Sequence, residues 1–366
     1  MHAGVNTLFL IPREVGGTEI YVRSVLPALL AQDAGLRVTI FTNRENHDSF
    51  AEYDRVLIDV AATSRPQRIV AEQVALPRAA ARATIDVLYS PGYTAPLRGP
   101  CAQVVTIHDT QFLDFPEDFP WLSRTAQRAI VGGAARRAHA ITTVSEFSRG
   151  RIAERFGVPR EKIAVAHSAL SGLFAQPQPC ALHRPFLLYI ANTYPHKNAA
   201  RLVRAFGRIA DRVPHMLVIC GQPREGEPPP HPRVKRIHYI AYEELIGMVQ
   251  AADLMVFPSL YEGFGRPVVE AQEAGTRVIA SRSAAIPEIG GAGASYFDGE
   301  REESIAQAIL NALDEPADAR AAWTARGREN AKRFTWQACA ERTLGALRTA
   351  IATRQPKRCL PPPHST

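Results

Sequence analysis

The sequence predicts an α/β protein built from two doubly wound domains, each a parallel sheet flanked by helices. Three observations favour this class. Short apolar runs suited to buried parallel strands alternate with longer helical segments along most of the 366 residues. The first run leads into a glycine turn and a helix, which is how a doubly wound unit begins. The same alternation restarts at Phe186 after a loose stretch with prolines around 170–185, where we expect the domain boundary.

The N-terminal domain is predicted to span residues 1–175. Residues 5–12 (VNTLFLIP) suit the first strand, and Gly16 and Gly17 form a turn into a helix that ends near residue 32. The pattern G-x-G-x-x-G is missing, so this turn is not a dinucleotide fingerprint. Later strands are expected at 36–42, 56–60, 87–90, 103–108 and 141–145, and later helices at 71–85, 121–139 and from 146 onward.

Two residues should shape these helices. Pro77 removes a backbone donor inside the predicted helix over 71–85, so the helix should bend or break there. Ser145 precedes the helix that starts at residue 146 and is a suitable N-cap.

The second domain is predicted to span residues 185–335. Its strands are expected at 186–191, 216–221, 234–240, 254–257 and 277–280, and its helices at 199–212, 243–252, 304–313 and 317–334. A last helix is expected over 336–350, and the tail over 354–366 is expected to be disordered.

Composition excludes several classes of protein. The formal charge of +7 and the pI near 9.3 suggest an anionic partner, but no basic run interleaved with aromatic residues indicates nucleic acid. No apolar run approaches the roughly 20 residues that span a bilayer, and no signal-peptide pattern opens the chain. The cysteines contain no CxxC pair, which argues against a zinc site or a disulfide framework: Cys101, Cys180, Cys220, Cys339 and Cys359. We therefore expect a cytoplasmic protein.

Residues 256–270 (VFPSLYEGFGRPVVE) carry the main functional signal. An apolar run ending at Phe257 is typical of a buried parallel strand, and Gly263 and Gly265 follow in the next loop. Pro267 then suits the first turn of a helix. A glycine loop that leads into a helix N-terminus presents free N–H groups to an anion, so the pattern predicts a phosphate site.

Two carboxylates flank this loop, Glu262 before it and Glu270 about one turn into the helix. A carboxylate beside a phosphate would repel it, so these two side chains more plausibly accept hydrogen bonds from hydroxyl groups. N–H groups that donate to a phosphate, placed between carboxylates that accept from hydroxyl groups, describe a pocket for a nucleotide-sugar.

The spacing of Glu262 and Glu270, with seven residues between them around Gly-Phe-Gly-x-Pro, resembles the E-x7-E motif of retaining family 4 glycosyltransferases (glycosyl transferase group 1), in particular mannosyltransferases. The resemblance covers about residues 5–350. It implies the GT-B fold, in which two Rossmann-like domains face each other across a cleft and the last helix crosses back to the first domain.

The resemblance implies donor contacts around this motif. Glu270 would bind the ribose hydroxyls, Glu262 would bind hydroxyls of the sugar, and the backbone after the strand at 234–240 would read the nucleobase near Ile240. The usual glycine there is Ala241, which leaves the base open. The loop and the helix start would contact the donor through Gly263, Phe264, Gly265, Pro267 and Val268.

Other site residues follow from the same resemblance. His108 and Asp109 end a predicted strand and match the family's His-Asp position, where the histidine faces the transferred sugar; a packing histidine and a capping aspartate are the alternative. Gly16 and Gly17 would face the donor phosphates across the cleft, or form a tight turn and nothing more. Lys197 matches a lysine that contacts the diphosphate; a surface lysine is the alternative.

A departing nucleoside diphosphate builds negative charge, which a positioned ammonium such as Lys197 stabilises. Many relatives place an arginine a few residues earlier, but residues 192–196 contain none, so His196 or the helix N-terminus would have to supply the rest.

The expected reaction is transfer of a hexose from a nucleotide-sugar to a hydroxyl group with retention of configuration. GDP-mannose is the first choice of donor, followed by UDP-hexoses and dTDP-rhamnose. The expected acceptor is a growing glycan or a lipid-linked saccharide such as lipopolysaccharide. No Asp-x-Asp occurs, so neither a metal nor any other cofactor is expected. A nucleotide-sugar epimerase of the same fold and a catalytically silent binding subunit are the alternatives.

Arginines in the first domain predict a basic face that contacts an anionic membrane surface or a pyrophosphate. A solvated charged face is the alternative. The arginines are Arg65, Arg68, Arg78, Arg82, Arg124, Arg128, Arg136 and Arg137, and the apolar residues expected beside them are Trp121, Leu122, Ile130 and Val131.

Overall fold

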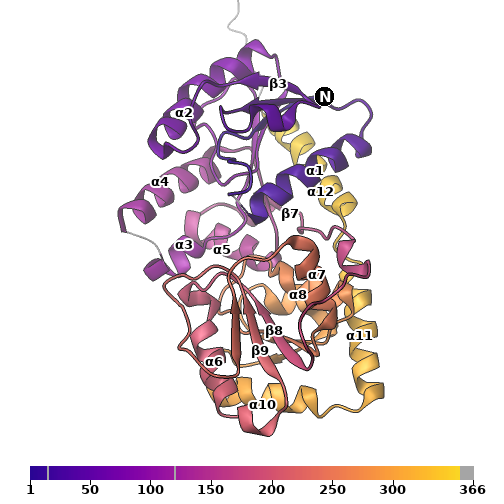
Figure 1. Ribbon diagram of the computed structural model, residues 1–366. Coiled ribbons are helices and arrows are strands. Elements are labelled where there is room, and N and C mark those ends of the chain that lie inside the picture. The colour runs from indigo at the N-terminus through magenta and orange to yellow at the C-terminus, as the bar shows by residue number, and fades with distance from the viewer. Residues whose placement is uncertain (15, 119–120, 355–366) are drawn as a thin grey trace, which may run out of the picture.

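The computed structural model describes residues 1–14, 16–118 and 121–354. The chain forms two parallel sheets in separate domains stacked one above the other (Figure 1). The first sheet has strand order β3-β2-β1-β4-β5-β6-β7 and the second has order β10-β9-β8-β11-β12-β13. The predicted class, two Rossmann-like domains in the GT-B arrangement, is confirmed. The predicted disordered tail lies almost wholly outside the described residues.

The N-terminal sheet contains β1 (His2–Asn6), β2 (Arg37–Thr42), β3 (Asp54–Leu57), β4 (Val87–Ser90), β5 (Ala102–Thr106), β6 (Ala140–Thr143) and β7 (Ile163–Val165). Its helices are α1 (Gly17–Gln32), α2 (Arg65–Arg82), α3 (Gln111–Asp114), α4 (Trp121–Arg137) and α5 (Glu146–Phe156). Every strand pair is parallel, so the carboxyl ends of the strands share one edge of the sheet.

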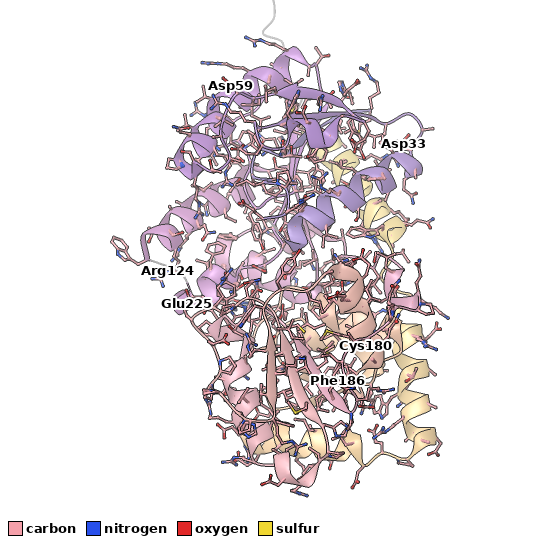
Figure 2. All side chains as sticks on the ribbon, viewed as in Figure 1. Asp33, Asp59, Arg124, Cys180, Phe186 and Glu225 are labelled. Carbon is pink, nitrogen blue, oxygen red and sulfur yellow. The ribbon has the colours of Figure 1, made fainter. Side chains whose placement is uncertain are left out.

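The C-terminal sheet contains β8 (Phe186–Ile190), β9 (Met216–Cys220), β10 (Val234–Ile237), β11 (Leu254–Phe257), β12 (Val278–Ser281) and β13 (Ala294–Phe297). Its helices are α6 (Ala199–Gly207), α7 (Tyr242–Ala251), α8 (Arg266–Ala274), α9 (Ile286–Gly290), α10 (Glu302–Leu313) and α11 (Ala317–Ala331). Phe186, at the start of β8, lies in the interior of this domain (Figure 2).

The predicted first strand over 5–12 is wrong at both ends, because β1 runs from His2 to Asn6. Leu8 and Leu10 are fully buried but belong to a loop. The side chain of Asn43 donates to the carbonyl oxygens of both leucines, at 3.1 and 2.9 Å. A buried loop is stable only when its backbone polar groups are paired, and this asparagine supplies the pairing.

Helix α2 differs from its predicted range of 71–85. It begins at Arg65, directly after Ser64, and continues through Pro77 to Arg82 without a break. Leu76 and Ala80, which flank the proline, are buried against the sheet. We attribute the continuity of the helix to this packing, which offsets the lost backbone hydrogen bond.

The chain crosses between the domains twice. The first crossing connects β7 to β8, and the second leads from α11 into α12 (Trp336–Thr353). Helix α12 packs on α1 of the first domain (Figure 1) and on β5. The thiol of Cys339 on this helix lies 3.8 Å from the Tyr21 hydroxyl of α1. No helix of the described residues is long and apolar enough to cross a bilayer.

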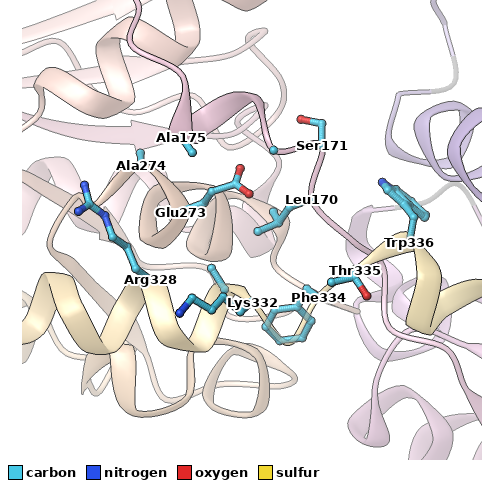
Figure 3. Close-up of a pocket in the computed structure, with 12 residues that line it drawn as sticks. Leu170, Ser171, Ala175, Glu273, Ala274, Arg328, Lys332, Phe334, Thr335 and Trp336 are labelled. Carbon is cyan, nitrogen blue, oxygen red and sulfur yellow. The ribbon is translucent and has the colours of Figure 1, made fainter.

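A cavity of about 660 Å³ lies at these two crossings (Figure 3). Leu170 and Ser171 of the first crossing line it, together with Glu273 of α8, Arg328 of α11 and Trp336 of α12. None of the predicted site residues lines this cavity, so we place it at the hinge rather than at the site of chemistry.

Candidate active site

The predicted site residues lie where the carboxyl ends of the two sheets face each other. His108 and Asp109 follow β5 of the first domain. Lys197 ends a short 3₁₀ turn (Pro195–Lys197) after β8, and Glu262 lies in the loop after β11. Ligands of open parallel sheets bind at such carboxyl ends, so the topology supports a site between the domains.

Lys197 and Glu262 form an ion pair in this region. The Lys197 ammonium lies 2.7 Å from Oε1 of Glu262, and the two side chains are 21% and 12% exposed. The hydroxyl of Tyr189 donates to the carbonyl oxygen of Lys197 at 2.6 Å and fixes the turn that carries the lysine. Both charged groups are therefore positioned but still accessible to a ligand.

The glycine loop is held against the first domain through Gly263. Its carbonyl oxygen accepts hydrogen bonds from the hydroxyls of Ser145 at 2.6 Å and Ser148 at 3.3 Å. A Cβ atom at Gly263 would come within 2.8 Å of Cβ of Asp109 and 3.0 Å of the carbonyl oxygen of His108. Only glycine permits this approach of the two domains.

The same loop presents unpaired donors. Within the described part of the chain, the backbone N–H groups of Gly263, Phe264 and Gly265 donate no hydrogen bond. Gly265 adopts φ 89°, which favours glycine, and Pro267 occupies the first turn of α8 as predicted. Free N–H groups at the start of a helix are suited to a phosphate.

The structure adds Arg266, which the sequence interpretation did not include. Its Nε lies 2.6 Å from Oε1 of Glu270, an i,i+4 pair on α8. Burial raises the pKa of Glu270, and the charge and hydrogen bond of Arg266 oppose that rise. Nη1 of Arg266 is buried without a partner among the described residues. The spacing R-x-x-x-E at a helix start was a readable signal for this pair.

The imidazole of His108 is held between Tyr21 and Tyr93, whose rings lie 5.0 and 5.2 Å from it. Its Nε2 lies 3.0 Å from the carbonyl oxygen of Pro91, which can only accept, so Nε2 carries the proton. Burial lowers the pKa of His108 to about 4. The ring is therefore neutral at physiological pH, and Nδ1 can accept a hydrogen bond from a hydroxyl.

Asp109 lies at the junction of the two domains beside Gly263. Burial raises its pKa, while hydrogen bonds from the Gln111 N–H and from Tyr93, together with the charge of Lys197, act in the opposite direction. Oδ1 accepts from the Gln111 N–H at 3.2 Å. The carboxylate thus faces the charged groups of the second domain.

His196 does not supply the second cation considered above. It is 2% exposed, and Nδ1 lies 2.5 Å from Oδ2 of Asp118 in the first domain. Burial and the charge of Lys197 lower the pKa of His196 to about 3, so the ring is neutral at physiological pH. A neutral ring protonated at Nδ1 donates to Asp118 and joins the domains.

The remaining residues that were predicted to contact the donor can reach a ligand only through their backbone, because their side chains are packed in a core or, at the two glycines, absent. The side chains of Phe264 and Val268 are buried in hydrophobic clusters, and Ile240 packs against the core of the second domain. Gly16 and Gly17 are exposed, with nothing within 4 Å of a Cβ at either position. No cluster of three or more His, Cys, Asp or Glu side chains in the described residues is arranged to hold a metal.

A carboxylate of the second domain also binds the first domain. Glu288 of α9 accepts hydrogen bonds from the backbone N–H groups of Glu146 at 2.8 Å and Phe147 at 3.0 Å, which start α5. The ring of His167 lies 3.0 Å from the same carboxylate. No local pattern in the sequence marks this contact, because the partners are more than 100 residues apart.

The two parallel-sheet domains face each other, and Glu262, Glu270, Lys197 and the glycine loop of the second domain lie at the edge that faces the first. This arrangement defines a glycosyltransferase of the GT-B fold. The family model "Glycosyltransferase Family 4" matches residues 15–171, and "Glycosyl transferases group 1" matches residues 175–330. The chain belongs to this family of glycosyltransferases.

Known proteins show the same relationship. The chain is 28% identical over 315 residues to O-antigen chain mannosyltransferase B of Escherichia coli, covering 78% of this chain and 81% of that one. It is 26% identical to O-antigen chain mannosyltransferase RfbU of Salmonella typhimurium, covering 57% of this chain and 60% of that one.

Solved structures resemble the fold over nearly the whole chain. Sucrose-phosphate synthase of Thermosynechococcus elongatus superposes with a TM-score of 0.74 at 18% identity, covering 96% of this chain and 99% of that one. Anabaena HepE in complex with UDP-glucose has a TM-score of 0.72 at 16% identity, covering 95% of this chain and 100% of that one.

Proposed function

We propose that this glycosyltransferase moves a mannosyl residue from GDP-mannose to a hydroxyl group of a growing glycan or lipid-linked saccharide. We further propose retention of the anomeric configuration and independence from metal ions. The observation that carries the proposal is the Lys197–Glu262 pair beside the free N–H groups of the glycine loop. The Lys197 ammonium and the free N–H groups bind anions, and the Glu262 carboxylate accepts hydrogen bonds from hydroxyl groups. A nucleotide-sugar requires both.

Each residue has a role in this reaction. The Lys197 ammonium and the N–H groups from Gly263 to Gly265 stabilise the charge of the departing diphosphate. Glu270 accepts from the ribose hydroxyls and Glu262 from the hydroxyls of the sugar. His108 is neutral, so it accepts a hydrogen bond from the sugar near the reacting carbon without repelling a developing positive charge.

The bond changes balance without a protein nucleophile. The bond between the anomeric carbon and the diphosphate oxygen breaks, and a bond from the acceptor oxygen to the same carbon forms on the same face. The proton of the acceptor hydroxyl passes to the departing diphosphate oxygen. This front-face route retains the configuration and needs no cation other than those of the chain.

The choice of mannose rests on relatives. The two O-antigen chain enzymes described above are named mannosyltransferases, and so is the MMP alpha-(1->4)-mannosyltransferase of Mycolicibacterium hassiacum at 27% identity over 239 residues. Anabaena HepE, which was solved with UDP-glucose, makes UDP-hexoses the next donors to test.

We also propose that the enzyme works at the cytoplasmic face of a membrane, with α2 and α4 against anionic lipid. Trp121 is 67% exposed at the start of α4, and Val70 and Val74 of α2 are 62% and 44% exposed beside the arginines. Val131 cannot be an anchor, because it is 1% exposed. Binding to vesicles with and without anionic lipid tests this placement; equal binding to both would refute it.

The direct test of the reaction is incubation with labelled GDP-mannose, UDP-glucose and dTDP-rhamnose in EDTA, with a saccharide acceptor. We expect a glycoside from GDP-mannose whose anomeric configuration matches that of the donor. An inverted product would refute retention, and activity that requires magnesium would refute metal independence. Conversion of the nucleotide-sugar to its epimer without an acceptor would favour the epimerase instead.

A further inference from the structure

A second cavity, of about 300 Å³, lies wholly in the first domain and opens toward the transfer site. Residues of α1, α2, α3, α4 and the loops after β1, β4 and β5 line it, and every lining residue precedes the hinge. Asp109 belongs both to this cavity and to the contact with Gly263 of the glycine loop. The cavity therefore faces the donor loops from the other side of the reacting carbon.

Two arginines of α2 line one part of the cavity. Arg65 and Arg68 lie one turn apart, and Arg65 donates to the Ser123 hydroxyl of α4 at 3.1 Å. Arg68 is half-buried, and its guanidinium forms no ion pair or hydrogen bond within residues 1–14, 16–118 and 121–354. A guanidinium removed from water without an anion is costly.

An acid on the same helix attracts this charge but forms no ion pair with it among the described residues. Glu72, one turn further along α2, accepts hydrogen bonds from Thr94 at 2.7 Å and from Asn6 at 3.1 Å. Burial raises the pKa of Glu72 and lowers that of Arg68, although their mutual attraction opposes both shifts. The guanidinium nevertheless remains charged at physiological pH.

The other partly buried arginines of the described residues bond to carboxylate, amide or carbonyl oxygens; Arg201 and Arg233, for example, donate to amide and carbonyl oxygens. Arg266 pairs with Glu270 at 2.6 Å, and Arg277 pairs with Glu315 at 2.8 Å. Arg68 departs from this pattern at a position that lines a cavity. This contrast indicates that its partner is a ligand.

The side chain of Gln127 on α4 brings an unpaired hydrogen-bond acceptor to this cavity. Oε1 of Gln127 is buried and has no hydrogen-bond partner in the described parts of the chain. Phe9, Tyr93 and Phe112 supply apolar walls beside it. A buried carbonyl oxygen without a donor, next to aromatic side chains, is suited to a sugar hydroxyl.

We propose that this cavity binds the acceptor and that Arg68, with Arg65 beside it, recognises a phosphate group on that acceptor. The phosphate occupies the arginine side of the cavity, a sugar hydroxyl donates to Gln127, and the hydroxyl that receives the transferred sugar lies toward Asp109. The acceptor class is thus a sugar phosphate, or a sugar diphosphate on a lipid. The inference rests on the proposed glycosyl transfer and names the substrate of that same site.

The test compares matched neutral and anionic acceptors. With GDP-mannose as donor, the apparent KM is measured for methyl α-mannoside and for mannose 1-phosphate, using wild type, Arg68→Gln and Arg65→Gln. Arg37→Gln is the control, because Arg37 is exposed at the start of β2 in the same domain and does not line the cavity. Binding of mannose 1-phosphate and of GDP is followed separately by calorimetry.

We expect wild type to favour mannose 1-phosphate, and Arg68→Gln to raise its KM about tenfold or more, as loss of a charge-assisted hydrogen bond predicts. The KM for methyl α-mannoside and the affinity for GDP should not change. Equal KM values for both acceptors in wild type, or an equal loss for both in Arg68→Gln, would overturn the proposal. Arg65→Gln provides the same test, with a smaller expected effect, if Arg68→Gln does not fold.

A third acceptor distinguishes the two sources of phosphate. A mannosyl diphosphate with a short alkyl chain should bind more tightly than mannose 1-phosphate, with the same dependence on Arg68, if the natural acceptor is lipid-linked. Equal binding of the two would assign a soluble sugar phosphate. Because GDP binding is measured alone, failure of the donor site is distinguishable from failure of this inference.

Discussion

The Lys197 ammonium lies 2.7 Å from Oε1 of Glu262, a residue 65 positions later in the chain. The pair links the turn after β8 to the loop after β11, so the two groups proposed to contact the donor diphosphate and the donor sugar are adjacent. An ammonium already paired with a carboxylate is oriented before the donor binds. We therefore expect the loss of either partner to disturb the other.

Lys197→Ala should mainly slow turnover. If Lys197 stabilises the leaving diphosphate, kcat should fall by about 10²–10³, as for the loss of other charge-stabilising donors. The donor KM should change much less. Steady-state kinetics checks this, with Lys332→Ala as the control, because Lys332 is 71% exposed and, among the described residues, pairs only with Glu329. An unchanged kcat would remove Lys197 from the site.

Glu270→Ala should instead weaken donor binding, because it removes the acceptor of the ribose hydroxyls. We expect the donor KM to rise about tenfold, the effect of losing one or two hydrogen bonds to a charged group. Kinetics with varied GDP-mannose measures the change. A fall in kcat at constant KM would contradict the role assigned to Glu270.

Arg266→Ala should make donor binding sensitive to pH. Burial already raises the pKa of Glu270, and Arg266 supplies the effects that lower it, so the variant should raise this pKa further. The carboxylate is then protonated at a higher pH than in wild type, so as the pH is lowered the donor KM should begin to rise earlier in the variant. Parallel KM profiles for wild type and variant would show that Arg266 does not act through Glu270.

Gly263→Ala should separate the domains at the site. The added Cβ would lie 2.8 Å from Cβ of Asp109, so one of the two loops must move. We expect a loss of turnover with little change in the affinity for GDP, which calorimetry measures separately. Gly345→Ala is the control: nothing lies within 4 Å of its Cβ, and the change should stabilise α12 by about 0.5–1 kcal/mol.

Glu288→Gln should weaken the contact between the domains. It should also remove the part of the protein's stability that depends on the ionisation of this carboxylate. Burial alone would raise the pKa of Glu288, but hydrogen bonds from His167 and from the N–H groups of Glu146 and Phe147 outweigh it and hold the pKa below 4.5. A folded-state pKa below the unfolded value contributes stability that is complete above about pH 4.5 and is lost as pH falls through the folded value.

Wild type should therefore lose its stability advantage over Glu288→Gln as pH falls below about 4.5. At neutral pH we expect the variant to be less stable by about 1–3 kcal/mol, typical of lost hydrogen bonds to a charged group. Urea denaturation at several pH values measures both, with Glu329→Gln, 74% exposed in wild type, as the control. A constant difference at all pH values would rule out the ionised carboxylate as the cause.

Local patterns predicted the parts of the structure that local forces decide. The apolar run that ends at Phe257, the two glycines and Pro267 identified the strand, loop and helix start of the site, because each residue type is suited to its own backbone position. Ser145 caps α5 as predicted, accepting from the Ser148 N–H at 3.0 Å.

Contacts between distant residues were not predictable in this way. The hydrogen bond from Ser145 to Gly263 and the contacts of Glu288 with α5 depend on how the domains pack, and no local pattern encodes that packing. The error at β1 has the same origin, because Asn43 stabilises a buried loop that an apolar run alone would assign to a strand.

The central claim, that the loop from Glu262 to Glu270 and Lys197 binds a nucleoside diphosphate, is tested most directly by thermal denaturation in EDTA with GDP, UDP, dTDP or ADP. A nucleotide at 100 times its Kd adds about 2.7 kcal/mol of stability, which is readily measured. We predict that GDP stabilises wild type without magnesium and that Glu270→Ala greatly reduces this shift. No shift with any of the four nucleotides would contradict the account.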